Sequence, residues 1–180
     1  MEVIEYIKSD LYRCYGKCDF LTFIKGFFLN KGFNYMFHLR CVQHGRILKL
    51  LSLVPYYLKR NFGSINIGRK CKIGYGLYLG HNGPVIINDN AVLGNNINLS
   101  QFVTIGSNDE KAAIIENEVY IGPSVCVVGD VHIGAKATIG AGAIVVKDVP
   151  ENGTCVGNPG KVINTDSDAR FILNKWGCRS

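Results

Sequence analysis

Aliphatic side chains recur at every sixth position over most of the chain beyond residue 66. The first residue of the six-residue unit is Ile, Leu or Val in thirteen successive units, and in eight of them glycine follows. The thirteen positions are Ile67, Ile73, Leu79, Ile87, Leu93, Leu99, Ile105, Ile115, Ile121, Val127, Ile133, Ile139 and Val145. Two extra residues enter the repeat within 79–86, and four enter it within 105–114. A six-residue period with one aliphatic side chain per unit is typical of a parallel β-helix, in which three units form one triangular coil.

The first 62 residues follow the spacing of helices instead. Apolar side chains in the stretches 3–11 and 33–42 recur every three or four residues, as on one face of a helix. The stretch 47–58 is apolar on most sides, and Pro55 is expected to break it. We therefore predict two or three helices that cover the N-terminal end of the solenoid, whose first coil would otherwise expose apolar surface.

These patterns divide the chain into three parts: a helical cap over 1–62, a β-helix that carries the active site over 63–163, and a tail over 164–180 with a short helix around 168–175. The cap is basic, with ten Lys or Arg and four Asp or Glu, whereas the remainder has ten of each. The basic residues are scattered along apolar helical sequence rather than clustered, which argues against nucleic-acid binding.

Composition excludes several other classes of protein. No stretch reaches the ~20 apolar residues of a membrane span, because Lys49 and Pro55 interrupt the best candidate. The acidic N-terminus, from Met1 to Glu5, lacks the apolar run of a signal peptide, so we expect a cytoplasmic protein. The seven cysteines form no CxxC pair and no Cys/His cluster, which predicts reduced thiols and no metal site.

His81 is the strongest candidate for chemistry. It stands between Gly80 and the pair Asn82-Gly83, where the repeat is interrupted, so we expect it on a bulging turn that solvent can reach. A histidine in that place can act as a general base, because its pKa is close to working pH. From these residues alone, an incidental loop histidine is an equal alternative. The other three histidines, His38, His44 and His132, carry weaker signals.

Several motifs resemble one known family. They are Leu29-Asn30-Lys31-Gly32-Phe33, Leu39-Arg40 with His44, Ile65-Asn66-Ile67-Gly68, the segment from His81 to Asn88, Gln101-Phe102-Val103-Thr104-Ile105-Gly106, Ile139-Gly140-Ala141-Gly142-Ala143 and Gly157-Asn158-Pro159-Gly160-Lys161. They make the run from Leu29 to Ile163 similar to the serine O-acetyltransferase group of left-handed β-helix acyltransferases. The similarity is greatest to short members from bacterial capsule and exopolysaccharide operons, including colanic-acid-type acetyltransferases.

This resemblance implies a fold, a donor and an assembly. The fold is a left-handed parallel β-helix, mainly β, with an N-terminal helical cap. The donor is acetyl-CoA, the acceptor is a hydroxyl, and the active sites lie between the neighbouring chains of a homotrimer. His81 matches the catalytic base, and Asn66 stands where the family has the carboxylate that orients it. The residues implied at the acetyl-CoA site are Gly106, Ser107, Pro123, Ala141 and Lys161, and those implied near the acceptor are Asn82, Gln101 and Arg40.

Departures from the family pattern concern the acceptor. Gly80 replaces the Asp that precedes the catalytic histidine in serine acetyltransferases, and the loop 107–113 lacks their Arg-His pair. Asn66 supplies no negative charge to an imidazolium. Because those groups hold a charged amino acid, we expect a neutral sugar hydroxyl of a surface polysaccharide or its lipid-linked precursor. The alternatives are a serine acetyltransferase of cysteine synthesis and a non-catalytic trimeric scaffold.

The aromatic and basic content of the cap bears on localisation. Thirteen of the Phe, Tyr and Trp residues lie in 1–62 together with the excess of Lys and Arg. Such a composition suits a membrane surface, which would agree with a lipid-linked acceptor. A packed cap with solvated charges is the alternative.

Overall fold

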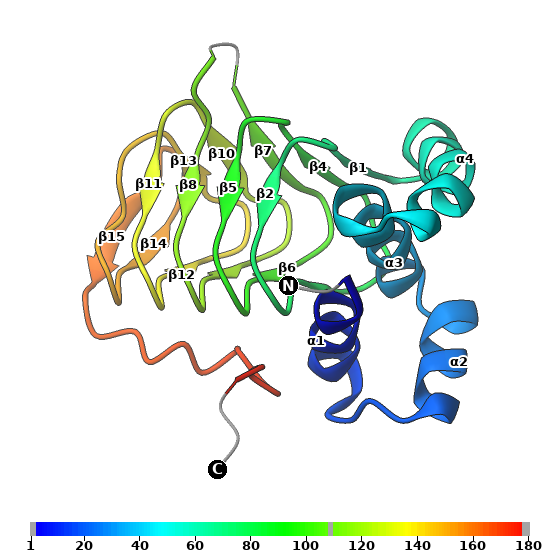
Figure 1. Ribbon diagram of the computed structural model, residues 1–180. Coiled ribbons are helices and arrows are strands. Elements are labelled where there is room, and N and C mark those ends of the chain that lie inside the picture. Colours follow the sequence, from blue (N-terminus) through cyan, green and yellow to red (C-terminus); the bar gives the residue numbers. More distant parts are fainter. Residues whose placement is uncertain (1–2, 108–109, 178–180) are drawn as a thin grey trace.

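The computed structural model describes residues 3–107 and 110–177, and it places a helical segment at one end of a β-solenoid (Figure 1). The helices are α1 (Val3–Tyr15), α2 (Phe20–Leu29), α3 (Lys31–His44) and α4 (Ile47–Phe62). Two side chains fix where helices begin: Asp19 accepts a hydrogen bond from the Thr22 N–H, and Asn30 accepts one from the Phe33 N–H, both at 2.9 Å. Four helices therefore replace the two or three that the spacing predicted.

Pro55 lies inside α4 and does not end it, so the predicted break is wrong. The proline has no N–H and leaves one carbonyl of the preceding turn without its helical partner. Packing compensates for that loss, because α4 lies along α3 and its Tyr56 is fully buried, with its hydroxyl donating to the Ile67 carbonyl at 2.9 Å. Among the described residues, no helix is both long and apolar enough to cross a bilayer.

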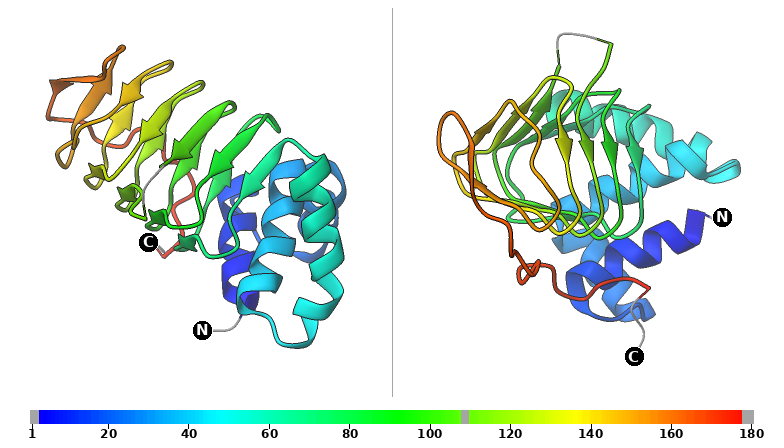
Figure 2. Two further views of the ribbon diagram at one scale, coloured as in Figure 1. Left: turned by 90° about the horizontal axis from the view of Figure 1, so that it is seen from above. Right: turned by 90° about the vertical axis from the view of Figure 1, so that its left-hand side faces the viewer.

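The solenoid is built from short strands that form the three faces of a prism (Figure 2). The strands are β1 (Ile65–Ile67), β2 (Lys72–Ile73), β3 (Tyr78–Leu79), β4 (Val85–Ile87), β5 (Val92–Leu93), β6 (Asn98–Leu99), β7 (Val103–Gly106), β8 (Ile114–Ile115), β9 (Tyr120–Ile121), β10 (Cys126–Val128), β11 (His132–Ile133), β12 (Thr138–Ile139), β13 (Ile144–Val145), β14 (Thr154–Val156) and β15 (Lys161–Asn164). The first sheet has the order β1-β4-β7-β10-β13, the second β11-β8-β5-β2 and the third β15-β14-β12-β9-β6-β3. Pairing is parallel except between β14 and β15, which form a closing hairpin.

The six-residue repeat sets the register of all three sheets. In the first sheet Ile67 pairs with Ile87, and Ile87 pairs with Ile105, so inward side chains stack from coil to coil. All thirteen repeat positions are buried, with none more than 6% exposed. This confirms the parallel β-helix. The residue two positions before each repeat position is buried as well, so each unit turns two side chains inward. The core continues into the helical segment, where Tyr35, Met36, Leu39, Val42 and Tyr56 pack on the first coil.

The tail runs back along the outside of the solenoid toward α1 (Figure 2). The expected helix around 168–175 is wrong, because the described residues 165–177 form only turns and irregular backbone. Hydrogen bonds to the solenoid hold this segment: Asn98 Nδ2 donates to the Phe171 carbonyl at 2.8 Å, and the Trp176 N–H donates to Asn96 Oδ1 at 2.8 Å. Its conformation is therefore set by distant side chains and not by helical hydrogen bonds.

Candidate active site

His81 lies on an exposed turn between β3 and β4. His81 and Asn82 both have positive φ, at 65° and 49°, a left-handed conformation that costs free energy in residues with a side chain. The Asn82 side chain holds the turn, because its Oδ1 accepts a hydrogen bond from the Gly32 N–H at the start of α3, at 3.3 Å. The imidazole makes no hydrogen bond, ion pair or ring contact with another described residue. It is therefore free to approach a bound molecule.

Two glycines permit this arrangement. A Cβ on Gly32 would lie 3.0 Å from both the Cβ and the carbonyl oxygen of Leu79, so a larger residue would require α3 or the strand before His81 to move by a few tenths of an ångström. A Cβ on Gly83 would lie 2.4 Å from the Cβ of Gln101, which packs against the turn. The turn is thus fixed from α3 on one side and from the next coil on the other. Gly32 belongs to a motif that the sequence singled out, but its contact with Leu79 has no signal in the sequence.

Four of the predicted site residues follow one edge of the prism. Leu79, Leu99, Ile121 and Ile139 pair successively in the third sheet. His81, Gln101, Pro123 and Ala141 each stand two positions beyond one of them. They therefore lie in successive coils along the edge where the chain passes from the third sheet to the first, here called the His81 edge. Lys161 is exposed at the start of β15, at the last coil.

Gln101 has a feature suited to a ligand. Its Oε1 is buried and has no hydrogen-bond partner among the described residues. A buried acceptor without a partner is costly unless another molecule supplies a donor. Because Gln101 packs against the His81 turn, such a donor would bind beside the imidazole.

Gly106 and Ser107 lie on a different edge of the same chain. Gly106 ends β7, where the first sheet passes to the second, and Ser107 follows it. Asn88 Nδ2 donates a hydrogen bond to the Ser107 carbonyl at 3.3 Å. The Ser107 hydroxyl donates to the carbonyl of Lys111 and so orders the described part of the loop 107–113; residues 108 and 109 lie outside the described chain. One chain therefore does not bring Gly106 and Ser107 to His81.

Asn66 is engaged by a neighbour other than His81. Its Oδ1 accepts a hydrogen bond from Arg60 Nε at 2.9 Å, and no hydrogen bond joins Asn66 to His81. Asp89, the nearest carboxylate in the sequence, accepts a hydrogen bond from the Lys70 N–H at 3.1 Å. That contact lies at the edge that contains Gly106. Within the described residues the imidazole of His81 has no orienting carboxylate.

Arg40 is a buried structural residue. Its guanidinium is 0% exposed and forms a two-pronged ion pair with Asp10, at 2.9 and 3.1 Å. It also donates to the carbonyls of Ile73 and Gly74, and it lies over the Tyr6 ring. These contacts fasten α1 and α3 to the first coil. We therefore assign Arg40 no contact with an acceptor.

Two cysteines and possible metal ligands are the other candidates for chemistry among the described residues. Burial raises the pKa of the Cys71 and Cys14 thiols, in each case to about 12, so neither is a ready nucleophile. The described part of the chain has no group of three His, Cys, Asp or Glu side chains placed to hold a metal ion. His81 is thus the exposed histidine on the edge that contains most of the predicted site residues.

Comparison with known proteins identifies the family. No family model matches the chain. Serine acetyltransferase 3, mitochondrial, from Arabidopsis thaliana is 31% identical over 177 residues, which are 90% of this chain and 43% of that protein. The apoenzyme of soybean serine acetyltransferase matches with a TM-score of 0.77 and 27% identity, covering 90% of this chain and 69% of the other. Serine acetyltransferase of Neisseria gonorrhoeae in complex with serine matches with a TM-score of 0.72 and 31% identity, covering 88% and 68%.

The chain belongs to the left-handed β-helix acyltransferase superfamily. The left-handed parallel β-helix with N-terminal helices, which the resemblance implied, is thereby confirmed. The relatives and structures named above are serine acetyltransferases, so the expected closeness to capsule and exopolysaccharide members is not supported. The chain spans about half the length of the curated relatives it matches.

Proposed function

We propose that the protein transfers an acetyl group from acetyl-CoA to a hydroxyl, with His81 as general base. The observation that carries this proposal is the exposed, left-handed His81 turn at the head of an edge that also contains Gln101, Pro123 and Ala141. Similarity to serine acetyltransferases over 90% of the chain supports it.

The chemistry requires one proton to move twice. His81 accepts the proton of the acceptor hydroxyl as its oxygen forms a bond to the thioester carbonyl carbon. The tetrahedral intermediate then breaks its carbon–sulfur bond, and the imidazolium returns the proton to the CoA sulfur. A positioned base of this kind contributes roughly 10²–10⁴-fold in rate.

Asn66 is the proposed partner of the base. Its amide oxygen has two lone pairs, of which the hydrogen bond from Arg60 uses one. The other can accept the imidazole N–H without a negative charge on the side chain. Asn66 would therefore orient the ring of His81 but would stabilise the imidazolium less than a carboxylate does.

The donor is proposed to lie along the His81 edge. Pro123 and Ala141 line that edge in the next coils, and the ammonium group of Lys161 stands at its far end, where it suits the phosphates of CoA. Gly106 and Ser107 join the same site only from a neighbouring chain. The proposed assembly is therefore a homotrimer with one active site between each pair of chains, as the superfamily resemblance implied.

Serine is the better supported acceptor. The polysaccharide acceptor expected from the sequence is not supported by the comparisons, which favour the alternative of a serine acetyltransferase. One observation keeps a neutral sugar hydroxyl as a second candidate. The residue before His81 is Gly80 and not an Asp, and the described loop positions 110–113 contain no Arg-His pair.

Thiol release from acetyl-CoA tests the function and the acceptor together. The protein is incubated with acetyl-CoA and L-serine, and in parallel with a panel of neutral sugars, and free CoA is measured with a thiol reagent. Serine-dependent release supports the first candidate, and release with a sugar alone supports the second. Absence of release with every acceptor, together with no calorimetric binding of CoA, would contradict the proposal and favour the trimeric scaffold.

A further inference from the structure

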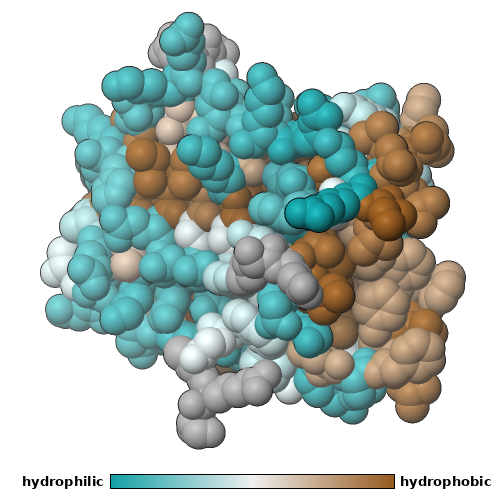
Figure 3. Space-filling view, in the orientation of Figure 1, coloured by the Kyte–Doolittle hydropathy of each residue, from teal (hydrophilic) through white to brown (hydrophobic). Residues whose placement is uncertain are grey.

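The outer sides of α2 and α4 form an exposed apolar surface. On α4, five aliphatic side chains at helical spacing are between 54% and 77% exposed, and on α2 two Phe and two Leu are between 72% and 77% exposed. With Phe62, they are defined here as the α2–α4 face: Phe20, Leu21, Phe28, Leu29, Ile47, Leu50, Leu51, Val54, Leu58 and Phe62. Figure 3 shows apolar surface over this side of the molecule. Gathered apolar surface of this kind marks a docking site.

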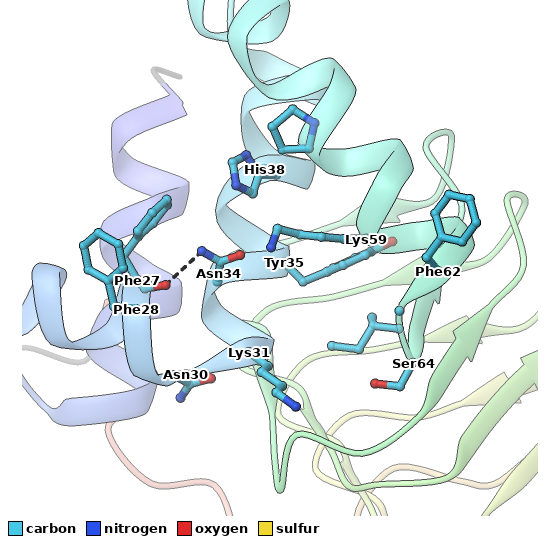
Figure 4. Close-up of a pocket in the computed structure, with 13 residues that line it drawn as sticks. Phe27, Phe28, Asn30, Lys31, Asn34, Tyr35, His38, Lys59, Phe62 and Ser64 are labelled. Atoms are coloured by element: carbon cyan, nitrogen blue, oxygen red, sulfur yellow. Dashed lines mark hydrogen bonds between the residues drawn. The ribbon is translucent and has the colours of Figure 1, made fainter.

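A cavity lies beside the α2–α4 face, between the two helices. It has a volume of about 740 Å³ and lies between α2, α3 and α4. Phe28 and Phe62 stand on opposite sides of it, and Lys31 and Lys59 reach into it (Figure 4). His38 also lines the cavity, and its Nδ1 is buried without a hydrogen-bond partner among the described residues. The α2–α4 face therefore combines exposed apolar side chains with a neighbouring cavity that contains two lysines and the unpaired Nδ1 atom of His38.

Within the stretch 20–62, which contains the α2–α4 face, the charged side chains have one sign, and Asp19 lies just before it. No Asp or Glu occurs between Asp19 and Asp89, whereas the stretch 20–62 holds seven Lys or Arg. Of these seven, Arg40 is buried against Asp10. The other six, which are Lys25, Lys31, Arg46, Lys49, Lys59 and Arg60, form no ion pair with a described residue. The face thus presents hydrocarbon and positive charge together.

This charge decides which occupant the face fits. A second copy of the same face would bring the seven Lys and Arg residues of one stretch 20–62 toward those of the other, with only the Asp19 carboxylate beside the face and that already paired with Lys17, which is repulsive. An anionic lipid bilayer offers a hydrocarbon layer for the apolar side chains and negative headgroups for the cations. We propose that the α2–α4 face docks on the surface of an anionic bilayer, with both helices lying in the interface. The proposal does not depend on acetyl transfer, because the face contains no residue of the candidate active site.

Vesicle flotation tests the docking. The full chain is mixed with vesicles of phosphatidylcholine alone, or of equal parts phosphatidylcholine and phosphatidylglycerol, and the floating fraction is measured at low and high salt. We expect flotation with the anionic vesicles at low salt, weaker flotation at high salt, and little with phosphatidylcholine alone. Failure to float with anionic vesicles, or equal flotation with both kinds, would overturn the proposal.

Matched variants locate the binding surface. Leu51 and Leu173 are the same residue type and are 70% and 69% exposed, but Leu173 lies on the tail, away from the α2–α4 face. Leu51→Glu is expected to lower membrane binding at least tenfold, and Leu173→Glu to leave it unchanged. Because both side chains are exposed, both variants are expected to fold, which thermal unfolding checks. Equal binding by Leu51→Glu and the wild type would contradict the proposal.

A charge variant and a sedimentation measurement complete the test. Lys25→Gln and Lys49→Gln are each expected to lower binding about fivefold, since one basic residue near an anionic surface contributes ~1 kcal/mol. Sedimentation equilibrium of the wild type and Leu51→Glu without lipid tests the rival occupant. The same oligomeric mass for both supports the bilayer. A larger wild-type assembly that Leu51→Glu dissociates would assign the face to a second copy and overturn the proposal.

Discussion

The solenoid and the helical segment both contain many apolar side chains. The solenoid buries them in its interior, whereas the helical segment exposes many of them to solvent. In the solenoid, all thirteen repeat positions point inward and are at most 6% exposed. In the helical segment, α3 is buried on most sides, whereas α2 and α4 contact it with one side and expose aliphatic side chains on the other. Each six-residue unit turns two side chains inward, the repeat position and the residue two before it, so the repeat itself defines the core. An apolar stripe on a helix marks which side of the helix is to be covered, but it does not identify the surface that covers it.

The two regions also differ in how they bury polar groups. The solenoid satisfies its backbone through the repeating hydrogen bonds between coils. The helical segment is joined to the first coil through side chains, above all Arg40, which binds Asp10 and two carbonyls of the solenoid. Stability should therefore depend on many equivalent contacts in one region and on a few particular contacts in the other.

Removing Arg40 should have the largest effect on stability. Arg40→Met leaves the buried Asp10 carboxylate without its cationic partner and with the Leu77 N–H as a remaining donor. We expect the free energy of unfolding to fall by about 3–5 kcal/mol. Lys8→Ala is the matched control, because Lys8 forms an exposed pair with Glu5 at 3.1 Å and should contribute about 0–1 kcal/mol. Denaturant unfolding measures both. A similar small loss for the two variants would remove the proposed role of the buried pair.

Truncating one leucine in each region should have the next largest effect, and only the solenoid variant should lose stability. Leu99 in the third sheet is 1% exposed and Leu51 on α4 is 70% exposed. We expect Leu99→Ala to cost about 2–5 kcal/mol because it leaves a cavity, and Leu51→Ala to change the free energy of unfolding by about 0.5 kcal/mol or less. Comparable losses in chemical denaturation would show that α4 packs against something in solution.

Acid should destabilise the helical segment through His38. Burial, with the nearby charge of Lys59, lowers the pKa of His38 from 6.5 to about 4. Between these values the unfolded chain binds a proton that the folded chain does not, so the free energy of unfolding falls as pH is lowered from 6.5 to 4. The expected loss is about 2–3 kcal/mol. His38→Phe, whose ring would meet Phe27 and Phe37, should reduce this pH dependence; an unchanged slope would contradict it.

Much of the solenoid could be predicted because its strands follow a short repeat that can be recognised within each stretch of the sequence. Spacing alone identified the inward positions, and the interruption at 79–86 marked the His81 turn. The helix through Pro55 could not be predicted in the same way, since it depends on packing against α3. The path of the tail depends on Asn96 and Asn98, which are distant in sequence.

The candidate site was predictable only in part. The strand register of the third sheet places Gln101, Pro123 and Ala141 on the His81 edge. That placement could be predicted because the repeat is regular there. The burial of Arg40 could not be foreseen, because its partner Asp10 lies thirty residues away with no marking motif. The separation of Gly106 from His81 likewise follows from the triangular cross-section and not from the residues themselves.

The central claim is that His81 is the base of an acetyl transfer at the solenoid edge. The most direct test is the steady-state kcat/KM for acetyl-CoA of the wild type, His81→Ala and His132→Ala, with sedimentation confirming the same assembly for all three. His132 is the matched control, as an exposed histidine elsewhere on the solenoid. The account predicts a loss of roughly 10²–10⁴-fold for His81→Ala and none for His132→Ala. Full activity of folded His81→Ala would contradict it.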